Sequence, residues 1–335
     1  MKAWQRVGIC AGFALSLLLL SLMLCQEYSG CFPESDLDNE AVMPVAPRSL
    51  LQEPGIPNQG SSSLRVLPPS SAAVVSTPRV PEAAINSLTR GSVSASEARD
   101  IYAFLESAGV PSGMTPVRLD AFKNDLMNML RNLEAPPTDL TQELIRLHAN
   151  PSQDLLLRVY ALQHLATWYD QITGPLLLDE RANPRARPPA EVAEVRRVLW
   201  DALNERRNGI AGTAILAHYH LAQNHPEFSV GEIGDKALEL AGDDTCDAIT
   251  RMSAMQVCGR MGLEAALSFA TRLASDPCSG PLRITAIATL GGLGGEKERV
   301  LLVEIANDDN AQLRVACESA LKKIGKRASL RGDDA

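Results

Sequence analysis

The sequence predicts an all-α protein: an α-solenoid of about five helical hairpins with an N-terminal helical cap, preceded by a disordered linker and one N-terminal transmembrane helix. Three observations predict it. A nine-residue segment recurs from residue 157 onward. Aromatic residues make up only 4% of the 335 residues, so the core must consist of small aliphatic side chains, which suit close helix packing. An uncharged apolar run stands at the N-terminus.

The apolar run, residues 7–24, follows Lys2 and Arg6 and precedes several acidic residues. Its length is within the range of ~17–25 residues that span a bilayer. The positive-inside rule then predicts that residues 1–26 anchor the chain with the folded part outside the cytoplasm, on the periplasmic side of a bacterium. Two alternatives stay open: a cleaved signal, although no A-x-A-like site follows, and a lipoprotein at Cys31, which Gly30 precedes.

Residues 27–94 are rich in Pro, Ser and acidic groups, and their apolar residues have no helical period. We therefore expect a disordered linker. Folded sequence is expected to begin near the Ser94–Glu97 capping box, and Thr115-Pro116 is a second helix start. We expect these two helices, within residues 95–137, to pack on the solenoid as its N-terminal cap. Residues 326–335 are expected to form a polar tail.

The recurring segment has an arginine at its second position, a small residue three positions later and an apolar residue or Cys seven positions later. The copies are LRVYALQHL from Leu157, TRMSAMQVC from Thr250, LRITAIATL from Leu282 and LRVACESAL from Leu313, with a degenerate TAILAHYHL from Thr213. Another apolar-periodic segment precedes each copy, which predicts a helical hairpin. One hairpin cannot cover both of its apolar faces, so the hairpins of residues 138–325 must stack.

The stretch from Asp276 to Gly325 resembles two HEAT repeats of the phycobilisome-lyase type, whose pattern is D…LR..A...L..LG. The resemblance implies a curved solenoid whose second helices line a groove, and a habit of binding proteins, but no chemistry. It also implies a structural ladder between repeat arginines and turn acids. The residues of this ladder are Arg158, Arg251, Arg283, Arg314, Asp244, Asp276 and Asp308.

Side chains two, six and nine positions after each arginine are predicted to face the groove, because their neighbours point into the stack. His164 and His220 should then be neighbours across it. A protein or peptide partner is expected there, with ordinary surface residues as the alternative. The predicted groove residues are Tyr160, His164, Thr167, Leu216, His220, Gln223, Ser253, Val257 and Arg260.

Other chemistry is weakly indicated. The stretch GGLGGEK ending at Lys297 lacks the GK[ST] ending of a phosphate loop and is expected to be a flexible turn. His218 and His225 share a helix face two turns apart, so a solvated face is expected and no metal site. The formal net charge of −8 argues against binding nucleic acid. No cofactor is expected.

Cys246 and Cys278 occupy equivalent repeat positions, five residues before Arg251 and Arg283. Equivalent positions on stacked hairpins lie roughly 8–10 Å apart, beyond the ~7 Å limit for a disulfide, so the two turns would have to lean together. A disulfide between them is one expectation for an oxidising compartment. Cys258 and Cys317 are expected to be small core residues.

These patterns together predict a membrane-tethered, non-catalytic protein-binding module. The alternative is a structural spacer or scaffold of an envelope assembly. A lyase-like enzyme is a weaker third reading, because it depends on the resemblance alone and no candidate acid–base pair converges.

Overall fold

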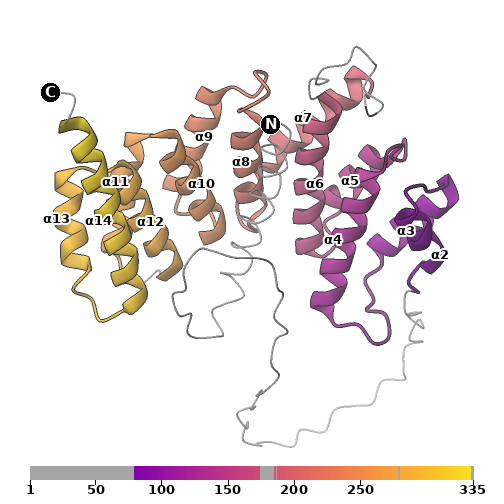
Figure 1. Ribbon diagram of the computed structural model, residues 1–335, viewed down its shortest axis with the longest axis horizontal. Coiled ribbons are helices and arrows are strands. Elements are labelled where there is room, and N and C mark those ends of the chain that lie inside the picture. The colour runs from indigo at the N-terminus through magenta and orange to yellow at the C-terminus, as the bar shows by residue number, and fades with distance from the viewer. Residues whose placement is uncertain (1–78, 174–184, 186, 278–279, 333–335) are drawn as a thin grey trace, which may run out of the picture. The chain divides into compact units, whose positions relative to one another are not determined.

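The computed structural model describes residues 79–173, 185, 187–277 and 280–332 (Figure 1). These residues contain thirteen α-helices, one short 3-10 helix and no strand, and all belong to one compact unit. The all-α prediction is therefore confirmed for the part of the chain that is described. The predicted membrane segment and most of the predicted linker lie outside it. None of the helices in the described ranges combines the length and apolar character needed to cross a bilayer.

Three helices precede the repeats: α2 (Glu82–Thr89), α3 (Ala95–Glu106) and α4 (Pro116–Asn132). The predicted capping box starts α3, since Ser94 Oγ accepts from the Glu97 amide at 3.3 Å and Glu97 Oε2 accepts from the Ser94 amide at 2.8 Å. Thr115 caps α4 with a single bond, in which its Oγ1 accepts from the Arg118 amide.

Helix α2 lies inside the range 27–94 that was predicted to be disordered, so that prediction is wrong at its C-terminal end. Ala84 and Leu88, one turn apart, are buried, and α2 packs on α3. Ser87 Oγ also donates to Glu97 at 2.5 Å. An apolar stripe of one turn is too short to recognise in a sequence, although it suffices once α3 supplies a surface.

Five helical hairpins follow in chain order (Figure 1). Every copy of the recurring segment lies in the second helix of a hairpin, as predicted. Residues 264–266 form the short 3-10 helix before the fourth hairpin. The hairpins are α5 (Leu140–Ala149) with α6 (Leu155–Thr173), α7 (Pro189–Ala202) with α8 (Ile210–Leu221), α9 (Val230–Gly242) with α10 (Ala248–Met261), α11 (Leu267–Ser275) with α12 (Gly280–Leu293), and α13 (Glu296–Ile305) with α14 (Ala311–Gly332).

The second helices pack directly on one another, α6 on α8, α8 on α10, α10 on α12 and α12 on α14, while α4 packs on α6. Small residues permit this close packing. A Cβ atom on Gly212 would lie 3.0 Å from the Thr250 Cα, and one on Gly291 would lie 2.6 Å from the Ala320 Cα. Side chains between these helices are consequently buried on both sides.

Gly291 also corrects the prediction of a flexible turn for GGLGGEK. Residues 291–293 belong to α12, and at Gly291 the backbone of α14 lies so close that an added Cβ would be 2.6 Å from the Ala320 Cα. Glycine is present because no larger residue fits between two helix backbones.

Helix α14 continues through residues 326–332, which were predicted to be part of a polar tail. Ile324 is buried, and Arg327 donates from Nη1 to the Gly291 carbonyl and from Nη2 to the Gly294 carbonyl, each at 2.5 Å. These bonds satisfy carbonyl groups at the end of α12, so the extra turns of α14 are fixed to the stack.

Three repeat arginines bind the end of the first helix of their own hairpin. The Nε atoms of Arg158, Arg251 and Arg283 donate to backbone carbonyls at 2.7, 3.3 and 2.8 Å, and the acceptors are His148, Ala241 and Ala274. Each arginine thus closes its hairpin by satisfying a carbonyl that the helix leaves unpaired.

The acid partners of these arginines differ from the predicted ladder. Arg251 Nη2 lies 2.8 Å from Asp244 Oδ1, as predicted, although without hydrogen-bond alignment. Arg283 instead pairs with Asp308 and Arg158 with Glu205, both in the turn of the following hairpin. Asp276 lies half-buried after α11. Arg314 is exposed, and no described residue forms a salt bridge with it, because no further hairpin follows α14 in the described chain.

Candidate functional site

Several predicted groove residues are buried, so their assignment to a groove is wrong. His164, Leu216, Ser253 and Val257 are each less than a tenth exposed. The cause is the direct packing of second helices on one another. His164 Nε2, for example, lies 3.1 Å from Asn124 Oδ1 of α4, and burial, reinforced by Arg131, lowers the pKa of His164 to about 3.

The other predicted residues remain accessible. Tyr160, Thr167 and His220 are half-buried, whereas Gln223 and Arg260 are exposed. His164 turns toward α4, whereas burial and nearby Arg260 of α10 lower the pKa of His220 to about 4. His164 is therefore enclosed between helices, and its predicted proximity to His220 stays a prediction. Gln223 and Arg260 do come together, at the recess described next.

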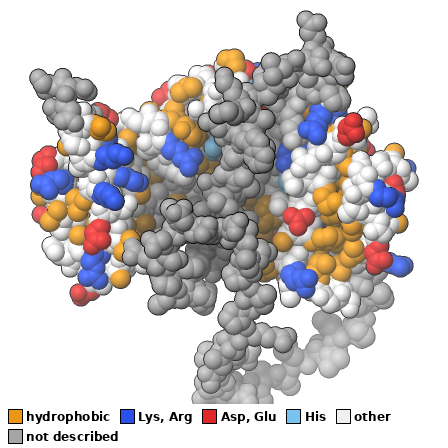
Figure 2. Space-filling view, in the orientation of Figure 1, with side chains coloured by type: hydrophobic (Ala, Val, Ile, Leu, Met, Phe, Trp, Pro, Cys, Tyr) orange, Lys and Arg blue, Asp and Glu red, His pale blue; other side chains and the backbone are white. Residues whose placement is uncertain are grey.

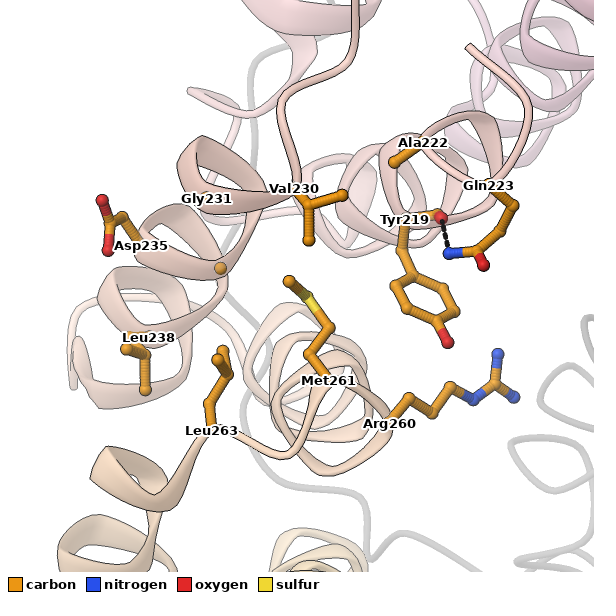
Figure 3. A pocket seen from close by; sticks show the side chains of 11 residues that line it. Tyr219, Ala222, Gln223, Val230, Gly231, Asp235, Leu238, Arg260, Met261 and Leu263 are labelled. Carbon is orange, nitrogen blue, oxygen red and sulfur yellow. Dashed lines mark hydrogen bonds between the residues drawn. The ribbon is translucent and has the colours of Figure 1, made fainter. Parts of the chain in front are cut away.

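A surface recess of about 580 Å³ lies where α8 ends, α9 begins and α10 ends (Figure 3). We call it the α8–α10 recess. Its lining residues are Tyr219, Ala222, Gln223, Val230, Gly231, Gly234, Asp235, Leu238, Arg260, Met261 and Leu263.

Local sequence explains the shape of the recess. Ser229 caps α9 by accepting from the Glu232 amide at 3.4 Å, which places Val230 at the rim with 57% of its surface exposed. Helix α10 stops at Gly262, whose φ of 71° is favourable for glycine. The reversal brings Met261 and Leu263 onto one side, and Gly234 leaves room for both, since its Cβ would be 3.3 Å from Met261 Cε.

The recess combines an apolar floor with charged ends. Figure 3 shows Val230, Met261 and Leu263 between Asp235 on α9 and Arg260 on α10. The Arg260 guanidinium lies over the Tyr219 ring, 5.8 Å from its centroid, and Gln223 Nε2 donates to the Tyr219 carbonyl at 3.1 Å. Tyr, Met and Arg are enriched in protein interfaces. This arrangement can hold an apolar side chain beside a carboxylate.

His218 and His225 are buried, which corrects the prediction of a solvated helix face. His218 Nδ1 donates to the Ala214 carbonyl at 2.8 Å, and its ring packs against Trp200 and Phe228. His225 Nε2 lies 2.9 Å from Asp170 Oδ1. Burial lowers the pKa of His218 to about 4. Within the described residues, no three His, Cys, Asp or Glu side chains are placed to hold a metal.

Cys246, Cys258 and Cys317 are free and buried in the described part of the chain. Cys278 lies outside the described residues, so the disulfide between Cys246 and Cys278 stays a prediction. Cys246 Sγ lies 3.6 Å from Asp243 Oδ2, and burial together with that carboxylate raises the pKa of the thiol to about 11.

Comparison with known proteins identifies the repeats. Residues 235–322, from within α9 into α14, match a family model described as HEAT repeats. No curated protein matches the chain. One solved structure, the crystal structure of an engineered protein from the Northeast Structural Genomics Consortium, is 13% identical with a TM-score of 0.36 and covers 68% of this chain and 97% of that one. A similarity that low supports no argument about fold. The family match supports the HEAT resemblance for residues 235–322, and the phycobilisome-lyase type remains a prediction.

Proposed function

We propose that this chain is a non-catalytic protein-binding module and that a segment of its partner enters the α8–α10 recess. The observation that carries the proposal is the apolar floor beside Tyr219 and Arg260, in which Met261 and Leu263 are half-buried and Val230 at the rim is exposed. HEAT repeats build extended surfaces that bind other proteins, and residues 235–322 match such repeats.

The chemistry of the recess defines the partner segment. Met261 and Leu263 favour an aliphatic side chain, because its burial removes apolar surface from water. Arg260 favours a carboxylate next to that side chain through charge-assisted hydrogen bonds. We therefore expect a short segment with an aliphatic residue adjacent to Asp or Glu.

The absence of catalysis is part of the proposal. Neither histidine nor cysteine is among the described residues that line the recess. Its charged groups, Asp235 and Arg260, lie at opposite ends and form no nucleophile–base pair. These features favour binding over a lyase-like activity in our proposal.

The tether is also proposed. The charges around residues 7–24 favour a membrane anchor with the HEAT-like part outside the cytoplasm. A C-terminal alkaline phosphatase fusion in a bacterial host should then be active. Activity of a cytoplasmic reporter in its place would overturn this localisation.

A displayed peptide library tests the binding proposal. Peptides selected on the full-length protein in detergent micelles should share an aliphatic residue next to an acidic one. Met261→Lys should abolish their binding, and Arg260→Glu should weaken it about tenfold or more. Arg207→Glu, at an exposed arginine between α7 and α8, is the matched control. Equal binding to the wild type and to Met261→Lys would contradict the proposal and favour the spacer alternative.

A further inference from the structure

Helix α14 carries an exposed stripe that no other part of the described chain covers. Val315 and Leu330 at its two ends are 64% and 59% exposed. Successive residues of the stripe are three or four positions apart, except for the adjacent Lys322 and Lys323, so the whole set lies on one helix face. In order, its members are Val315, Ser319, Lys322, Lys323, Lys326 and Leu330, all exposed. We call this set the α14 stripe.

The opposite face of α14 provides the contrast. Leu313, Cys317, Ala320 and Ile324 are buried, and α14 packs on α12 and α13. One repeat position, four residues after the repeat arginine, shows the difference. It is buried in earlier second helices, as at Met255 and Ile287, but in α14 it is the exposed Glu318. The stack of the described chain therefore ends at α14, and its outer face meets solvent.

The charge of this helix opposes that of the chain. The chain has a formal net charge of −8. Residues 311–332 nevertheless contain six basic residues and a single acid, Glu318. In Figure 2, both basic and acidic side chains lie over the end of the molecule that α13 and α14 form. Asp333 and Asp334 follow in the sequence, and even with both counted this terminal segment stays basic.

The three lysines of the stripe are exposed. No described residue forms an ion pair with Lys322, Lys323 or Lys326. The helix dipole favours cations only in the last turn, and Lys322 and Lys323 lie well before it. By contrast, Arg327 is occupied by the carbonyls at the end of α12.

The composition of the stripe distinguishes a lipid surface from a protein partner. Lysine is depleted in protein interfaces, where aromatic residues and arginine are enriched, and the stripe has three lysines and no aromatic residue. Clustered lysines on a helix surface are attracted to anionic lipid headgroups, and the exposed Val315 and Leu330 beside them can enter the boundary between headgroups and acyl chains. We propose that the α14 stripe docks on the anionic headgroups of a membrane surface. This inference does not depend on the α8–α10 recess.

Lysine footprinting of the full-length protein tests the inference at the stripe itself. The protein is acylated with a succinimidyl ester in the presence of phosphatidylglycerol-containing vesicles or of pure phosphatidylcholine vesicles, and modified lysines are quantified by mass spectrometry. Acylation of Lys322, Lys323 and Lys326 should fall about threefold or more with the anionic vesicles only. High salt should restore it, because salt screens exposed charges.

Lys297, an exposed lysine on α13 without an ion pair to any described residue, is the internal control and should react equally in both samples. Equal reactivity of the stripe lysines with both vesicles would overturn the inference. So would protection by soluble polyglutamate without protection by vesicles, which would indicate an acidic protein partner. Exchanging Lys322, Lys323 and Lys326 for Glu should abolish the preference for anionic vesicles, whereas Arg118→Glu, Arg207→Glu and Lys297→Glu together should retain it.

Discussion

Arg283 of α12 joins two successive hairpins. Its Nε donates to the Ala274 carbonyl at 2.8 Å inside its own hairpin, and its Nη1 lies 3.2 Å from Asp308 Oδ2 in the turn of the next. Arg158 makes the same two kinds of contact, with the His148 carbonyl and with Glu205. The repeat arginine therefore acts both as a cap of one helix and as a link across a repeat boundary.

The first prediction concerns this double contact. Arg283→Lys keeps the charge but cannot supply both Nε and Nη donors. We expect the free energy of unfolding to fall by about 1–3 kcal/mol, measured by urea denaturation, because a buried carbonyl loses a charged donor. Arg272 forms an exposed ion pair with Asp244, so Arg272→Lys should lower the free energy of unfolding by less than about 1 kcal/mol. An equal loss for the two variants would contradict the account.

The second prediction concerns helix spacing. Gly291→Ala should lower the free energy of unfolding by about 1–3 kcal/mol, because its Cβ would lie 2.6 Å from the Ala320 Cα and 2.7 Å from its Cβ. Adding Ala320→Gly should restore part of the loss. Gly259→Ala in α10, which meets nothing within 4 Å, should instead be neutral or stabilising. A destabilising Gly259→Ala with a neutral Gly291→Ala would refute the close approach.

The third prediction concerns pH. Burial lowers the pKa of His164 from 6.5 to about 3, so folding favours the neutral imidazole. The resulting stability is present above pH 6.5 and is lost as the pH falls toward 3. When the pH falls from 7 to 5, the free energy of unfolding should decrease in both proteins. We expect the decrease to be about 1–2 kcal/mol smaller for His164→Gln than for the wild type. Urea midpoints at the two pH values measure this, and parallel losses would show that His164 does not contribute.

The fourth prediction concerns the thiols. Burial raises the pKa of Cys258 to about 12, and that of Cys246 to about 11, so both stay protonated at neutral pH. Iodoacetamide should label them in urea but only slowly in buffer. Rapid labelling of Cys258 in the folded protein would contradict its burial. A non-reduced digest that contains a Cys246–Cys278 peptide pair would confirm the predicted disulfide, and both cysteines as free thiols would end it.

Local signals predicted the helices well. The Ser94–Glu97 capping box and Thr115-Pro116 start α3 and α4 where expected, and the recurring arginine correctly marks the second helix of each hairpin. These features depend on residues a few positions apart, which the sequence displays directly. The length of α14 depends instead on the distant contacts of Arg327, and a sequence pattern does not reveal them.

The groove prediction failed at Leu216 and Ser253 because it treated each second helix as having one packed face. A second helix that packs on the second helices before and after it needs small residues at the points of contact. Gly212 of α8, which faces Thr250 of α10, is such a residue. Helix α8 is apolar on nearly every side, which indicates full burial and could have revealed the position of His218. Sequence periodicity also missed the α8–α10 recess, since Val230 and Met261 are terminal residues of different helices.

The most direct measurement is site-specific photo-crosslinking from two valines of nearly equal exposure, Val230 at the recess and Val300 on α13, which are 57% and 55% exposed. A benzophenone side chain replaces each in turn in the full-length protein, in the cells that express it naturally. If the α8–α10 recess binds a partner, a discrete protein adduct forms from position 230 and not from position 300, and Met261→Lys removes it. Adducts of equal yield from both positions, or an adduct from 230 that persists with Met261→Lys, would contradict the account.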